Sequence, residues 1–113
     1  MKKINLRSKA EKNKSEYVFG AEDSGSHACY MIYGFLKPGE KERVIRPGKG
    51  HEEILAAVKG CLTVTGRYSG TLEEGHAFHI EGDQTCFLEN TGDSEAVYIV
   101  AGGHSDRGHG HSH

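Results

Sequence analysis

Histidine, glutamate and cysteine side chains are the groups in this sequence best suited to bind a metal ion. His51 and Glu53 stand two residues apart, so both side chains point to the same side of an extended segment. Cys86 shares its parity with Leu88, which predicts that it faces inward. Imidazole, carboxylate and thiolate together suit zinc or another late transition metal better than manganese or calcium. The alternative interpretation is a buried, inert Cys86 and a solvated loop histidine at position 51.

Two further histidines belong to one short apolar segment. His76 and His79 have opposite parity, so at most one of them faces the same side of a strand. We take His79, which shares its parity with Ala77 and Glu81, as the fourth candidate ligand. The alternative is a partly buried, hydrogen-bonded histidine without a metal.

The end of the sequence concentrates imidazole groups on a chain of glycine and serine. These candidate ligands are His104, His109, His111 and His113. Histidine-rich tracts of this kind bind nickel, copper or zinc. Asp106 and Arg107 interrupt the series, which favours a native tail over a purification tag. No apolar residue can dock this tail, so we expect 103–113 to be disordered in the free protein.

Short segments separated by glycine must position these groups. The sequence has 16 glycines and only 2 prolines, which favours many tight turns. Apolar, β-branched and alternating runs predict strands at Tyr17–Phe19, His27–Leu36, Arg43–Arg46, Cys61–Thr65, Tyr68–Leu72, Ala77–Ile80, Thr85–Leu88 and Ala96–Val100. Strands at this spacing predict a β-sandwich or β-barrel.

The segment 52–60 contains signals for a helix. Acidic residues open it, good helix formers follow, and Gly60 closes it. Taken alone, these residues favour a helix at least as much as a strand.

From Pro38 to Val100 the sequence resembles the cupin family. The first cupin motif ends in a glutamate, six residues and a glycine, and Glu53 and Gly60 match this spacing. The second motif begins at a glycine and ends at an asparagine, which Gly75 and Asn90 match. The resemblance implies an all-β, single-domain jelly-roll barrel, an extended 52–59 and an inward-facing Glu53.

The resemblance also implies a ligand set that this chain retains only in part. Cupins typically use three histidines and one glutamate. The paired histidines of the first motif fall at Pro47 and Lys49, or at Arg46 and Gly48 after a one-residue gap. The histidine of the second motif falls at Cys86. The resemblance therefore predicts the fold and does not carry over a dioxygenase site.

Composition narrows the class of protein. A net charge of −2 argues against a nucleic-acid surface. The charged N-terminus lacks the apolar run of a secretory signal, and no later run is long enough to span a membrane. Three cysteines at unrelated spacings are typical of reduced thiols, so we expect a cytoplasmic protein.

These observations predict a flexible leader at 1–15, a cupin domain at 16–102 and a histidine-rich tail at 103–113. We expect a homodimer that pairs through the strand edge around Tyr17–Phe19. The leading function is binding of zinc or nickel, for metal handling or for a metal-dependent reaction on a small molecule. The alternative is a non-catalytic cupin that binds a small organic ligand without metal. The sequence does not decide whether the protein is an enzyme.

Overall fold

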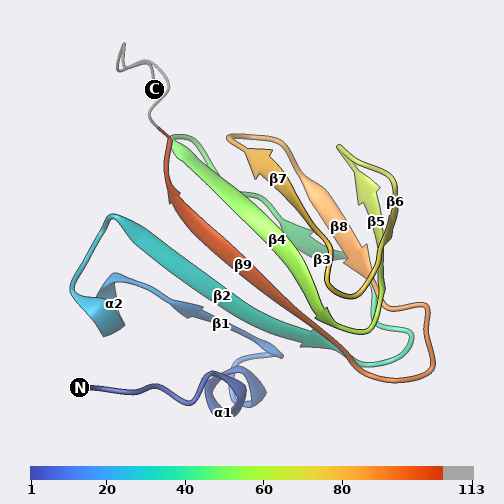
Figure 1. Ribbon diagram of the computed structural model, residues 1–113, viewed down its shortest axis with the longest axis horizontal. Helices are drawn as coiled ribbons and strands as arrows, with labels where there is room; N and C mark the ends of the chain where they lie inside the picture. The colour runs from blue at the N-terminus through green and yellow to red at the C-terminus, as the bar shows by residue number, and fades with distance from the viewer. Residues whose placement is uncertain (106–113) are drawn as a thin grey trace.

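Residues 1–105 form nine β-strands and two short helices in the computed structural model, which describes this part of the chain (Figure 1). In chain order the elements are α1 (Leu6–Glu11), β1 (Glu16–Phe19), α2 (Ala21–Ser24), β2 (Cys29–Leu36), β3 (Arg43–Ile45), β4 (His51–Lys59), β5 (Leu62–Gly66), β6 (Gly70–Leu72), β7 (Ala77–Glu81), β8 (Cys86–Glu89) and β9 (Ala96–His104). Neither helix is long and apolar enough to cross a membrane.

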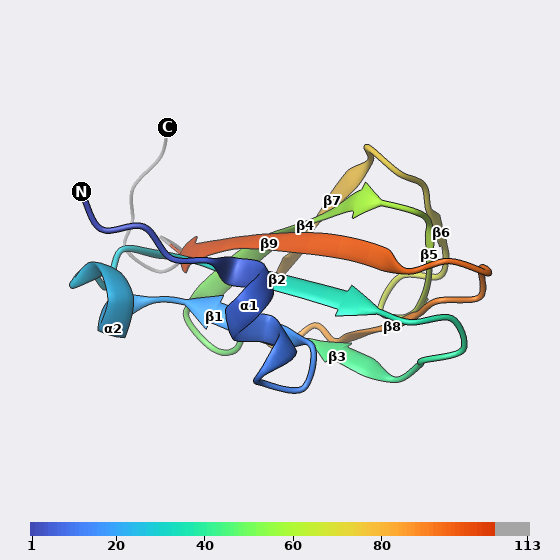
Figure 2. The same cartoon turned by 90° about the horizontal axis from the view of Figure 1, so that it is seen from below.

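The strands form two antiparallel sheets that pack face to face. The first sheet has the order β1-β2-β9-β4-β7, and the second has the order β3-β8-β5-β6. Figure 2 shows the two layers from the side, with β2 and β9 in one and β3 and β8 in the other. This arrangement confirms the predicted all-β jelly-roll barrel.

Strand β4 shows that the ambiguous segment is extended. Its burial alternates, because Glu53, Leu55 and Ala57 are buried while Ile54 is exposed. β4 pairs with β9 on one side and with β7 on the other, so its backbone groups are satisfied by neighbouring strands. Pairing on both edges and the burial of one face override the helix propensity of these residues.

The inner faces of the two sheets enclose the main hydrophobic core. Its largest fully buried side chains include Leu36, Leu55, Ile80, Leu88 and Tyr98. Because these residues come from five different strands of both sheets, the core forms only when both sheets have assembled. The candidate sites described below lie toward one end of this barrel.

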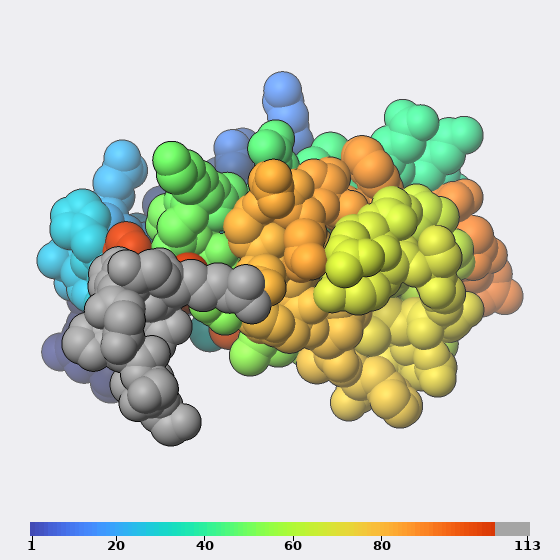
Figure 3. Space-filling model, turned by 90° about the horizontal axis from the view of Figure 1, so that it is seen from above, coloured from blue at the N-terminus to red at the C-terminus, as the bar shows by residue number. Residues whose placement is uncertain are grey.

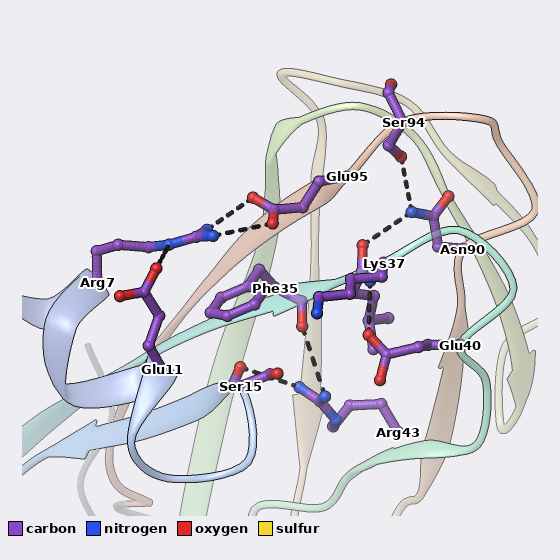
Figure 4. Close-up of polar contacts among 11 residues, drawn as sticks. Arg7, Glu11, Ser15, Phe35, Lys37, Glu40, Arg43, Asn90, Ser94 and Glu95 are labelled. Atoms are coloured by element: carbon purple, nitrogen blue, oxygen red, sulfur yellow. Dashed lines mark hydrogen bonds and ion pairs between the residues drawn. The ribbon is translucent and has the colours of Figure 1, made fainter.

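Within the segment 1–15, where a flexible leader is predicted, residues Leu6–Glu11 form helix α1, which packs on the first sheet. Ala10 of α1 is fully buried against Phe35 and Val97 on the outer face of the first sheet. The Arg7 guanidinium donates to both carboxylate oxygens of Glu95 at 2.6 and 2.9 Å, and lies 3.7 Å from the centre of the Phe35 ring (Figure 4). The apolar Ala10 and the bidentate Arg7–Glu95 ion pair therefore hold α1 against the sheet. The charged composition of this segment did not predict that contact.

A buried asparagine fixes the connection between β8 and β9. The Asn90 side-chain amide donates to the carbonyl oxygens of Leu36 and Ser94 at 2.9 and 2.8 Å (Figure 4). Its side-chain oxygen accepts from the Gly92 amide at 2.9 Å. The asparagine of the second motif thus has a structural role, which is to hold this turn against the end of β2.

Candidate metal centre and barrel mouth

Three ligand side chains meet on the outer face of the first sheet. In the pairing of β4 with β7, Glu52 stands opposite Glu81, and Ile54 stands opposite His79. The ligand atoms of Glu52, His79 and Glu81 all lie within 4.8 Å of one another. His79 Nε2 donates to Glu52 Oε1 at 2.8 Å. We call these three residues the outer triad.

The outer triad has the composition of a divalent metal site. One imidazole nitrogen and two carboxylates are ligands that zinc accepts, and three protein ligands leave one position of a tetrahedral ion open. Within residues 1–105 this is the only group of three or more histidine, cysteine, aspartate or glutamate side chains with all ligand atoms within 4.8 Å.

The inner face of the same sheet carries a buried carboxylate. Glu53 is only 4% exposed, and its carboxylate accepts a hydrogen bond from the Tyr30 hydroxyl. The two residues stand on β4 and β2, and Gly102 of β9 lies between them in the same row. A Cβ atom at position 102 would collide with the Tyr30 ring. The missing side chain of Gly102 therefore gives Tyr30 its path across β9.

Burial dominates the ionisation of this pair. It raises the pKa of Glu53 above the usual carboxyl range, against smaller opposing effects of the Tyr30 hydrogen bond and of His51. Burial and the bond to Glu53 also raise the pKa of Tyr30. Burial therefore disfavours the charged form of Glu53, and the hydrogen bond from Tyr30 favours it. Carboxyl groups with shifted pKa values of this kind are often found at functional sites.

Two histidines lie beyond Glu53 at the same end of the inner face. His51 stands opposite His104 in the pairing of β4 with β9. Their ring centres are 5.0 Å apart and their planes are tilted by 31°. His51 also makes an edge-on contact with Tyr30, with ring centres 5.9 Å apart. His51, His104, Tyr30 and Glu53 form a polar cluster that we call the barrel mouth.

The structure brings together only part of the predicted interior site. His51 and Glu53 share a face, as their spacing predicts. Cys86 is fully buried in the hydrophobic core, opposite Ile45 of β3. Within residues 1–105 no compact ligand group contains Cys86. The grouping of His51, Glu53 and Cys86 around one ion is therefore not present.

His79 also lies elsewhere than expected. Ile80, not His79, stands opposite Glu53 in the pairing with β7, so His79 points to the outer face. This corrects the placement of His79 as a fourth interior ligand. Its actual neighbours, Glu52 and Glu81, were not predicted as ligands. The shared parity of His79 and Glu81 was the available signal, but their pairing with Glu52 depends on a register between strands that are not consecutive.

The histidine-rich tail begins at this end of the barrel. His104 belongs to β9, which extends past the expected domain end at 102, and the Ser105 amide donates to the Gly50 carbonyl oxygen at 2.8 Å. His109, His111 and His113 lie outside the described residues. The chain thus leaves the barrel beside β4, which contributes to both the outer triad and the barrel mouth.

Comparisons with known proteins agree on the architecture. No family model and no curated protein matches the sequence. Among solved structures, the chain is similar to TT1209 from Thermus thermophilus, with a TM-score of 0.67 and 20% identity over 92% of this chain and 98% of that one. An oxalate oxidase gives a TM-score of 0.68 and 21% identity over 91% and 56%. The Cnp3 cupin domain of Schizosaccharomyces pombe gives 0.61 and 12% over 76% and 65%.

The chain has a cupin fold. The resemblance of its two motifs to those of cupins therefore identified the architecture correctly.

The residues of this cupin barrel do not fit the interior metal set that the fold family implies. Pro47 and Lys49 offer no ligand at the first-motif positions, and Cys86 lies in the apolar core. Of the motif ligands only Glu53 remains, and its Oε2 accepts a hydrogen bond from the Tyr30 hydroxyl. A metal site built from three motif histidines and Glu53 cannot form here, because the chain lacks these histidines.

Proposed function

We propose that this cupin-fold protein binds a divalent transition metal, zinc or nickel, at the outer triad. The observation that carries the proposal is the convergence of Glu52, His79 and Glu81 from two paired strands, with all ligand atoms within 4.8 Å. Two carboxylates would neutralise a divalent charge, and the imidazole favours a transition metal over calcium or magnesium.

The exposed position of the outer triad supports two uses of the ion. A metal with an open coordination position can act as a Lewis acid on an oxygen-bearing small molecule. An exposed site can equally store or pass on an ion that the tail histidines His104, His109, His111 and His113 capture first. The free cysteines Cys29, Cys61 and Cys86 are consistent with the reducing conditions of the cytoplasm, where we place the protein.

Titration calorimetry with zinc and nickel tests the proposal. The background protein carries His109→Ala, His111→Ala and His113→Ala, so that tail binding does not obscure the barrel. His79→Gln and Glu81→Gln should each weaken binding at one site by at least about tenfold, because loss of a ligand costs no less than loss of its supporting contacts.

The matched control is His76→Gln. His76 is an exposed histidine just before β7, in contact with the Glu74 carbonyl oxygen, and it lies outside the outer triad. Its substitution should leave zinc and nickel binding unchanged. Equal affinities for all variants would refute the outer triad as the metal site.

The barrel mouth favours a second candidate function, binding of a small organic ligand without metal. The carrying observation is the buried Glu53 with Tyr30 and two histidines above it. A few polar groups that converge beside apolar surroundings are typical of ligand sites. A related structure of oxalate oxidase holds the substrate analogue glycolate. Stabilisation by glycolate in the presence of a chelator, lost in Tyr30→Phe, would support this function. Full retention in Tyr30→Phe would exclude the mouth.

A further inference from the structure

The two histidines of the barrel mouth are held in complementary ways. His51 Nδ1 lies 3.2 Å from the Lys49 carbonyl oxygen, and His104 Nε2 lies 2.5 Å from the His27 carbonyl oxygen. A carbonyl oxygen can only accept, so in each contact the ring nitrogen must be the donor. The other nitrogen of each neutral ring, His51 Nε2 and His104 Nδ1, then keeps its lone pair.

A hydrogen bond from one ring nitrogen to a backbone carbonyl oxygen is common among histidines that bind metal. A ligating imidazole usually donates its second ring N–H to a backbone carbonyl or carboxylate, which fixes the tautomer and the ring orientation. Here two neighbouring imidazoles are both fixed in this way.

The spacing of the rings fits a shared ion. Two imidazoles bound to a tetrahedral metal at about 2.0–2.1 Å place their ring centres about 5 Å apart. The centres of His51 and His104 are 5.0 Å apart. The cross-strand register that pairs these residues sets this spacing, because directly opposed side chains on an antiparallel ladder are close neighbours.

A negative group lies on the same face, one strand position below. Glu53 follows His51 by two residues and is coupled to it electrostatically. Its buried carboxylate would make the mouth more favourable for a cation. The opening is accessible to an ion, because His104 is exposed and His51 is partly exposed. Figure 3 shows this end of the molecule, where the loop before β4 and the β7–β8 loop lie side by side.

We propose that His51 Nε2 and His104 Nδ1 form a second metal site, separate from the outer triad and on the opposite face of β4. An all-imidazole pair favours copper(II) or nickel(II), which bind nitrogen ligands more strongly than earlier divalent metals do. Neither histidine stands at a cupin motif position. The site is an addition of this chain, built from the first residue of β4 and the last residue of β9.

Nickel titration of the protein that lacks the three tail histidines tests the site. The variants are His51→Ala, His104→Ala and the double substitution. Each single substitution should weaken one nickel site by at least about tenfold. The double substitution should cost less than the sum of the two single ones, because two residues that share one ion are coupled. His79→Gln should leave this site intact and affect only the outer triad, so the two proposals fail separately.

Two measurements guard against misfolding as an explanation. His104→Asn keeps an amide donor for the His27 carbonyl oxygen, so it should retain the melting temperature while still weakening nickel binding. In the protein that lacks only the three tail histidines, substoichiometric nickel should broaden the imidazole NMR signals of His51 and His104 before that of His76, which lies outside both proposed sites. Unchanged affinity in both single variants, or equal broadening of His51, His104 and His76, would overturn the proposal.

Discussion

At the scale of single residues, the Tyr30–Glu53 hydrogen bond determines whether a buried carboxyl group is tolerated. Tyr30→Phe removes the donor and leaves Glu53 buried without it. We expect a loss of about 1–3 kcal/mol in the free energy of unfolding at neutral pH, measured by urea denaturation. Tyr68→Phe, an exposed tyrosine on the β5–β6 connection, is the control and should change little.

The pH dependence of this loss has a defined sign. Burial already raises the pKa of Glu53 in the folded state, so ionisation of Glu53 costs stability as the pH rises through that value. Without Tyr30 the pKa rises further, and the cost of Tyr30→Phe must grow with pH over this range. A difference between the two proteins that stayed constant from about pH 4 to about pH 8 would contradict this account.

The three cysteines should differ in reactivity. Cys29 and Cys61 are exposed, whereas Cys86 is fully buried in the core. A thiol reagent in excess should therefore modify two cysteines quickly in the native protein and the third only after unfolding. Cys86→Ala should leave metal binding unchanged. Three equally fast thiols would show that Cys86 is accessible and reopen it as a ligand.

The spacing of residues along the chain predicted correctly which side chains share a face within one strand. Two-residue parity placed His51 and Glu53 together correctly. It could not place His79 relative to Glu53, because that relation depends on the register between β4 and β7, which are separated by two other strands in the sequence. Tyr30 was visible only as an aromatic residue of a long strand, since its path over Gly102 depends on three strands at once.

At the scale of elements, the stability that the docking of helix α1 contributes should depend on pH. The Arg7 guanidinium lowers the pKa of Glu95 below the usual carboxyl range. The ion pair thus stabilises the fold above that range and loses its effect as the pH falls through the folded-state pKa. Arg7→Gln should lower the melting temperature at about pH 7, and the difference should shrink at about pH 3.

Lys12→Gln, at the C-cap of the same helix, provides the control for charge. It removes one positive charge from α1 and leaves the contact with Glu95 intact, so its melting temperature should follow the wild type at both pH values. A parallel drop in both variants would mean that net charge, and not docking, stabilises the helix.

One arrangement in the first sheet occurs twice. Glu16, Gly34 and Tyr98 form a row across β1, β2 and β9, and the Tyr98 hydroxyl donates to Glu16 across the glycine. Tyr30, Gly102 and Glu53 repeat the pattern at the other end. In the first row Arg43 of β3 also donates to Tyr98 at 2.7 Å and compensates the charge. No arginine in the described part of the chain bonds to the second row, where the Tyr30 hydrogen bond and His51 are the groups that favour the charged form of Glu53.

The extended conformation of 52–59 was predictable only through the cupin motif. Local propensity alone favours a helix there. The burial of Leu55 between two partner strands decides the outcome, and neither partner lies in the local sequence. The docking of α1 was missed for the same reason, since Ala10 and Arg7 find their partners on β2 and beside β9.

At the scale of the whole molecule, the association of two copies remains a prediction. Strand β1 lies at the edge of the five-stranded sheet, and Val18 on it is 50% exposed. Exposed strand edges with apolar side chains favour pairing. We expect a homodimer by light scattering at high micromolar concentration. Val18→Lys should shift it toward monomer, whereas Val58→Lys, similarly exposed on another strand, should not.

Both proposed metal sites depend on strand β4, because its successive side chains point to opposite faces of the sheet. His51 and Glu53 face the barrel interior, and Glu52 between them faces outward. Inserting or deleting one residue within β4, between Glu53 and the buried Leu55, would move His51 and Glu53 to the outer face and Glu52 to the inner face, and would dismantle both sites together. Point substitutions can alter either site alone, but a change in chain length cannot. Over evolution, the spacing from His51 to Leu55 should therefore vary less than the length of the turn from Pro47 to Gly50.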